Sequence, residues 1–96
     1  MATIDIKRGH ELEMDTARER AETLAKELEG KLGINWRWEG DAIRFQADAG
    51  KAKGAKGAVS VTNSAVRVEI DLPFLLRPLK GMVEGKVRDR LDKLVG

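Results

Sequence analysis

The apolar residues follow two different periods along the chain. Residues 4–7 alternate between apolar and charged side chains, as in a strand that buries one face. From Met14 to Leu32 the apolar positions recur at steps of three and four, which is typical of a helix with one buried stripe. The first third of the chain is therefore predicted to form a strand followed by a helix.

The ends of this helix carry local signals. Thr16 and Glu19 have the spacing of a capping box, so we expect the helix to begin near Asp15 or Thr16. Glycine is common just beyond helix C-termini, and Gly30 and Gly33 are expected to end it.

Residues 34–45 read as a β-hairpin. Gly40 and Asp41 separate two alternating runs, and glycine at the first central position suits a type II′ turn. This turn places Trp38 opposite Ile43 and gathers the large apolar side chains on one face. The residues of that face are Trp36, Trp38, Ile43 and Phe45.

A second hairpin is predicted over residues 58–71, with Asn63 and Ser64 as its turn. Its valines would then pair across the strands, Val61 with Val66 and Val59 with Val68. Residues 48–57, between the hairpins, consist almost entirely of Gly, Ala and Lys and are predicted to form a mobile loop without apolar anchors.

The last segment has helical spacing again. Proline disfavours helical geometry at the residue before it, so we expect an irregular turn through Arg77 and the main helix from about Pro78. Its apolar stripe comprises Leu76, Leu79, Val83, Val87, Leu91 and Leu94.

The fold class predicted by this order is α+β. Every predicted strand has one apolar face and each helix has one apolar stripe, so a single antiparallel five-stranded sheet with both helices on one face, in the order β-α-β-β-β-β-α, buries them all. Residues 1–96 form one domain in this interpretation, and the other face of the sheet is exposed to water.

The composition limits which partners the protein is expected to bind and where in the cell it is expected to occur. The chain has 18 Lys and Arg against 16 Asp and Glu, a formal charge of +2, and this small surplus does not indicate a nucleic-acid-binding protein. Cysteine is absent, and the longest apolar run, residues 72–76, is far too short for a transmembrane segment. We therefore expect a cytoplasmic protein.

The tryptophans have two interpretations. RNA-binding sheets of the RRM type carry their aromatic residues on the open face, whereas here they share the face with the valines and isoleucines. We predict that Trp36 and Trp38 belong to the core and are mostly buried under the C-terminal helix. The alternative is a partly open groove lined by Trp36, Trp38 and Phe45.

The sequence favours a protein without catalysis. His10 is the only histidine, and Ser60 and Ser64 are the only serines, so no pairing of a nucleophile with a base is indicated. A polar loop or capping role is favoured for His10. No spacing typical of metal ligands occurs, and we predict neither a metal site nor a cofactor.

One apolar stretch does not fit a buried stripe. Phe74, Leu75 and Leu76 are consecutive, and three successive residues of a helix cover roughly 200° of its circumference. Leu76 is in phase with the later stripe, so Phe74 or Leu75 should point to solvent. With Arg77 and Lys80 beside them, these residues are the candidate surface for binding a partner, a hydrophobic surface or a second copy of the chain.

Several segments together resemble the polyhydroxyalkanoic acid system protein family. The most specific are W-R-W-E-G-D at 36–41 and L-L-R-P-L-K-G at 75–81; the others are residues 4–10, 17–25, 32–45 and 66–72. The resemblance implies a bacterial protein connected with polyhydroxyalkanoate storage granules, and it brings no set of catalytic residues.

Two functions follow as hypotheses. The first is a non-enzymatic accessory protein that binds the granule surface or a granule-associated protein, with a homodimer as a further option. The second rests on a resemblance of the C-terminal segment to helix-grip, START-like domains, and is a small carrier that holds an apolar ligand between the sheet and that helix.

Overall fold

A computed structural model describes residues 3–50 and 52–95. Five strands form one antiparallel sheet in the order β1-β5-β4-β3-β2. The elements follow along the chain as β1 (Ile4–Gly9), α1 (Met14–Leu32), β2 (Asn35–Glu39), β3 (Ala42–Gln46), β4 (Lys56–Val61), β5 (Ala65–Asp71), the 3₁₀ helix η1 (Phe74–Leu79) and α2 (Lys80–Val95). The predicted fold class and order of strands and helices are confirmed, with η1 as an addition.

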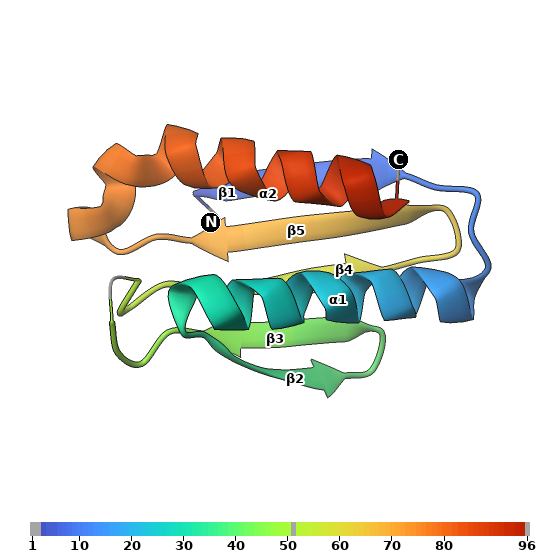
Figure 1. The fold of residues 1–96 in the computed structure, drawn as a ribbon, viewed down its shortest axis with the longest axis horizontal. Coiled ribbons are helices and arrows are strands. Elements are labelled where there is room, and N and C mark those ends of the chain that lie inside the picture. Colours follow the sequence, from blue (N-terminus) through green and yellow to red (C-terminus); the bar gives the residue numbers. More distant parts are fainter. Residues whose placement is uncertain (1–2, 51, 96) are drawn as a thin grey trace.

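Both helices lie on the same face of the sheet (Figure 1). Helix α1 packs against β2, β3 and β4, and α2 packs against β1 and α1. One continuous core fills the space between the layers, with apolar side chains from all five strands and both helices. Each helix therefore covers its own half of the sheet.

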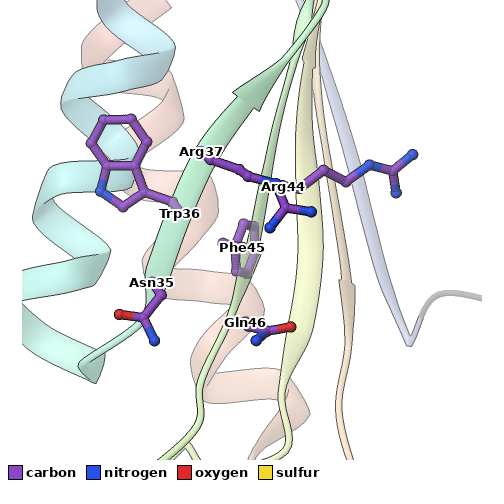
Figure 2. Close-up of a pocket in the computed structure, with 6 residues that line it drawn as sticks. All are labelled: Asn35, Trp36, Arg37, Arg44, Phe45 and Gln46. Carbon is purple, nitrogen blue, oxygen red and sulfur yellow. The ribbon is translucent and has the colours of Figure 1, made fainter.

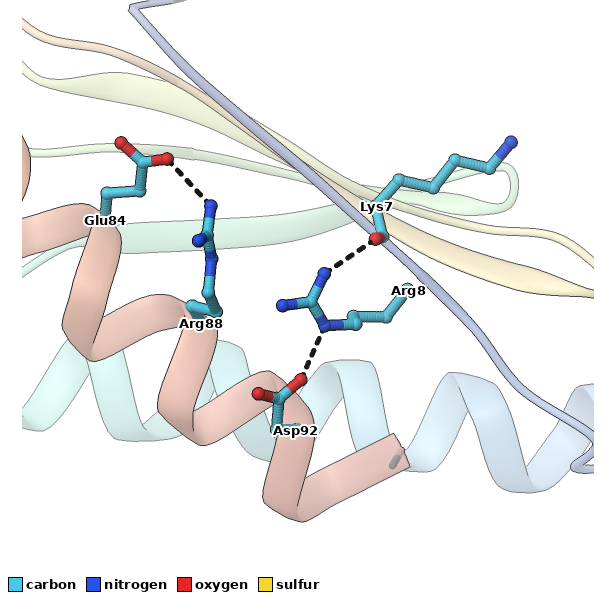
Figure 3. A network of polar contacts seen from close by, with 5 residues as sticks. All are labelled: Lys7, Arg8, Glu84, Arg88 and Asp92. Atoms are coloured by element: carbon cyan, nitrogen blue, oxygen red, sulfur yellow. Dashed lines mark hydrogen bonds and ion pairs between the residues drawn. The ribbon is translucent and has the colours of Figure 1, made fainter.

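Polar contacts join the two helices to their neighbours. Arg8 on β1 donates a hydrogen bond from Nε to Asp92 on α2 at 2.5 Å, and Figure 3 shows this pair beside the Glu84–Arg88 pair within α2. Arg90 of α2 donates to Glu27 of α1, with Nε 2.7 Å from Oε2. This hydrogen-bonded ion pair lowers the pKa of the Glu27 carboxyl.

The predicted end of α1 at Gly33 is confirmed, whereas the predicted capping box at its start is not. The helix begins at Met14 after Glu13, which makes no side-chain cap, so the capping box predicted at Thr16 is wrong. Its start is held by the Ala17 N–H, which donates to the Glu13 carbonyl at 2.9 Å. Gly30 lies inside the helix, and Gly33 alone ends it with a left-handed φ of 71°.

The two hairpins have the predicted registers. Trp38 pairs with Ile43 and Trp36 with Phe45, and Gly40 has a φ of 64° at the first central position of the turn. Val59 and Val61 likewise pair with the two predicted valines of β5, around a turn at Asn63 and Ser64. Two-residue turns fix such registers locally, because every later pair follows from the first.

The connection between the hairpins is shorter than predicted. Strand β4 begins at Lys56, and Ala52 and Ala55 are buried in the core, so the expectation of a segment without apolar anchors is wrong. The Ala47 and Ala55 backbones are joined by a hydrogen bond of 2.8 Å. Lys51, within the predicted loop, lies outside the described residues.

Candidate functional site

The most unusual surface is made of large apolar side chains at the start of α2. Phe74 is 80% exposed, Leu75 85%, Leu79 43% and Met82 54%. These four residues, here called the apolar patch, belong to η1 and the first turn of α2, which extend beyond the ends of β1 and β5 at one end of the molecule (Figure 1). Large apolar side chains that are exposed on such a projecting segment are typical of an interaction site.

The backbone of η1 explains why these side chains are exposed. Pro73 is extended, and the Leu76 N–H donates to its carbonyl at 2.9 Å, which starts a 3₁₀ turn. With three residues per turn, successive side chains diverge by about 120°, so one face can meet the core while the others cannot. Leu76 is the half-buried member that packs against the core, and Phe74 and Leu75 point to solvent.

Basic side chains flank the apolar patch. Arg77 and Lys80 are both exposed, and residues 73–83 contain no Asp or Glu. Gly81 is exposed between Lys80 and Met82, with open space where a side chain would stand. The surface therefore combines exposed apolar side chains with two cationic ones, and residues 73–83 supply no carboxylate to neutralise them. Such a surface can bind an apolar material whose boundary is neutral or anionic.

The four candidate surface residues are all exposed. Two more exposed apolar residues, Leu79 and Met82, follow in the same segment and were not among the candidates. Leu79 had been assigned to the buried stripe, and that assignment is wrong for a side chain 43% exposed. Met82 is out of phase with the stripe of α2, a signal present in the sequence.

The aromatic hairpin lies under α1, and the prediction that the C-terminal helix covers it is wrong. Trp36 and Trp38 are half-buried against the core, whereas Phe45 is only 6% exposed. Helix α2 packs on β1, at the opposite edge of the sheet from β2. The tryptophans thus belong to the part of the core that α1 closes.

Polar groups of α1 hold Trp38 in place. Its Nε1 donates a hydrogen bond to Glu22 at 3.0 Å, and this bond is the main reason why the pKa of the Glu22 carboxyl is lowered. Arg18 stacks over the indole at 4.1 Å from the ring centroid and also pairs with Asp41 in the hairpin turn at 2.7 Å. No local pattern in the sequence indicates this contact, because it depends on the placement of α1 over β2.

Hollows occur on the outer, helix-free face of the sheet. One of about 130 Å³ lies at Arg37 and Arg44, and in Figure 2 the Trp36 indole points to the α1 side, away from both arginines. A wider one of about 530 Å³ extends across the same face over Ala58 to Glu69. Both are bordered mainly by charged and amide side chains, so neither is the apolar groove between sheet and C-terminal helix that a carrier requires.

His10 has a structural position. Its Nδ1 accepts a hydrogen bond from the Leu12 N–H at 3.0 Å, and its Nε2 lies 2.9 Å from the Thr62 carbonyl. The ring thereby links the β1–α1 connection to the β4–β5 turn. Within residues 3–50 and 52–95, no three His, Cys, Asp or Glu side chains are grouped as metal ligands would be.

Comparison with known proteins places the chain in a family. Residues 4–95 match the family described as "Putative polyhydroxyalkanoic acid system protein" (PHA_gran_rgn). The chain belongs to this family, as its sequence motifs had indicated. Comparisons with curated proteins and with solved structures gave no match. Among the described residues, no helix is long and apolar enough to cross a membrane.

Proposed function

We propose that this protein is a non-enzymatic accessory protein of the polyhydroxyalkanoate system that attaches to the surface of storage granules through the apolar patch. The observation that carries the proposal is the exposure of Phe74 and Leu75, at 80% and 85%, on a segment that contributes no buried residue to the fold. The family supplies the context of the polymer. The site of action is then the bacterial cytoplasm.

The chemistry of the surface matches such a phase. Polyhydroxyalkanoates are polyesters with alkyl side chains, and burying one Phe or Leu side chain against an apolar surface contributes about 1.5–3 kcal/mol. Phe74 and Leu75 together would contribute roughly 3–6 kcal/mol before the cost of immobilising the protein. Arg77 and Lys80 are placed to contact ester carbonyls or anionic groups at the boundary. Attachment by one copy is therefore reversible.

The test is co-sedimentation of the purified protein with polymer granules. Phe74→Ser combined with Leu75→Ser should lower the bound fraction several-fold and leave the melting temperature nearly unchanged, because neither side chain packs in the core. Arg20→Ser combined with Glu29→Ser, at exposed positions of α1, is the matched control and should bind as the wild type does.

Two results would refute the proposal. One is unchanged binding of the Phe74 and Leu75 double variant to granules. The other is a large loss of stability in that variant, which would assign the side chains to the core. Granules stripped of protein distinguish the binding of polymer from the binding of a granule-associated protein, since only the first survives stripping.

A further inference from the structure

A second surface lies at the free edge of β2. Among the described residues, this strand ends the sheet and pairs with β3 alone, so its outer edge is open for pairing. The other edge strand, β1, is packed by α2 and tied to it through Arg8 and Asp92. At the β2 edge, by contrast, two tryptophans are only half-buried.

The hairpin register determines which backbone groups face outward. In an antiparallel hairpin with a two-residue turn, the pair that flanks the turn, Glu39 with Ala42, is hydrogen-bonded, and bonded and non-bonded pairs then alternate. The N–H and C=O groups of Trp36 and Trp38 consequently point away from β3. They form a short row of donors and acceptors along the open edge.

We propose that β2 pairs with β2 of a second copy of this chain, antiparallel and centred on Trp38. With a two-fold axis at Trp38, its outward N–H donates to the Trp38 carbonyl of the second copy. Its own carbonyl accepts a hydrogen bond from the Trp38 N–H of that copy. The same axis also places Arg37 opposite Glu39 of the second copy, twice in the pair. A two-fold axis at Arg37 would instead place Arg37 opposite itself, and like charges directly opposite each other destabilise a strand pair.

The side chains of Arg37 and Glu39 can exchange their present ion pair for one with the second copy. Arg37 contacts Glu39 of its own strand at 2.7 Å, but the two side chains are 78% and 42% exposed, so exchange for the opposite copy costs little. The pairing would cover the half-buried tryptophans on the helix side. Because β2 has five residues, the buried area is small, and association should be weak and concentration-dependent.

This surface is independent of the apolar patch. The patch lies on η1 and α2, which is associated with β1, whereas β2 forms the opposite edge of the sheet. Self-pairing therefore goes beyond granule attachment. Each can fail without the other.

Disulfide trapping tests the register, because the natural chain contains no cysteine. Residues of a non-bonded antiparallel pair have Cα atoms about 4.5 Å apart, which a disulfide can bridge. A mixture of Arg37→Cys and Glu39→Cys chains in a thiol redox buffer should form a cross-linked dimer at least tenfold faster than either variant alone. Arg44→Cys mixed with Arg37→Cys is the control on the same face, and it should not exceed the rate of the single variants.

Charge reversal tests the pairing without cross-links. In sedimentation equilibrium, Arg37→Glu or Glu39→Arg should weaken the wild-type dimer at least tenfold, and the two changes together should restore it. Thermal unfolding checks that each variant folds. A monomeric wild type, a double variant that does not regain the dimer, or Arg37→Cys that cross-links alone as fast as the mixture would overturn the proposal.

Discussion

The ring of Phe45 on β3 lies over Gly57 on β4, its cross-strand partner. A Cβ atom built on Gly57 would stand 2.6 Å from Cζ of Phe45 and 2.2 Å from the carbonyl oxygen of Glu69. Both distances are far below van der Waals contact. The absence of a side chain at position 57 is what allows the aromatic ring to pack against the sheet.

We therefore expect Gly57→Ala to destabilise the protein, by about 1–3 kcal/mol, as overpacked cores do. Gly30→Ala is the matched control, since nothing lies within 4 Å of a Cβ at this position in α1. It should stabilise the fold by up to about 1 kcal/mol, because alanine is the better helix former. Urea denaturation of both variants measures the difference, and an equal sign of the two effects would contradict the packing described.

Leu72 and Leu75 are three positions apart in the chain and differ sharply in burial. Leu72 is 4% exposed and Leu75 is 85% exposed. Leu72→Ala should cost about 2–5 kcal/mol of unfolding free energy, and Leu75→Ala should stay within about 0.5 kcal/mol of the wild type. A costly Leu75→Ala in thermal unfolding would show that the apolar patch belongs to the core.

The sequence predicts a structural feature well when the interactions that determine it lie within a few residues of the chain. The pairing of Trp38 with Ile43 follows from two turn residues beside it, and its register was predicted correctly. The exposure of Phe74 or Leu75 followed from the geometry of consecutive residues. In both cases the deciding interactions lie within a few residues of the chain.

Features that depend on the arrangement of whole elements could not be predicted in this way. Whether α1 or α2 covers Trp38 is set by how the helices divide the sheet, and periodicity carries no such information. Leu79 was misassigned for a related reason: η1 has three residues per turn and α2 has 3.6, so the phase of the buried stripe shifts where they join.

The Glu27–Arg90 pair between the helices predicts a pH dependence. Its hydrogen bond lowers the pKa of Glu27 in the folded state below the ordinary glutamate value of about 4.3. A lowered pKa contributes stability above the unfolded pKa, and this contribution is lost as the pH falls through the folded pKa. Wild type should thus be more stable than Glu27→Gln at pH 7, and the gap should shrink below about pH 4.3.

Denaturant unfolding at a series of pH values measures this gap. Glu29→Gln, at an exposed position near the same end of α1, serves as the control for the loss of one carboxylate. A gap between wild type and Glu27→Gln that stays constant from neutral to acidic pH would refute the linkage.

Arg18 is expected to contribute more to the stability of the fold than other polar residues on the surface of α1. Its guanidinium lies 4.1 Å from the Trp38 ring centroid and 3.2 Å from the Gly40 carbonyl oxygen, to which it donates, so it connects α1 to the hairpin turn. Arg18→Ala should lower the free energy of unfolding by about 1 kcal/mol, through the lost stacking and ion pair, and should increase the quenching of tryptophan fluorescence by acrylamide. Arg18→Lys should recover only part of both effects, because an ammonium group lacks the planar fork that stacks and donates together. Arg20→Ala, at an exposed position two residues away, should change neither quantity, and quenching of Arg18→Ala equal to that of the wild type would mean that Arg18 does not shield the indole.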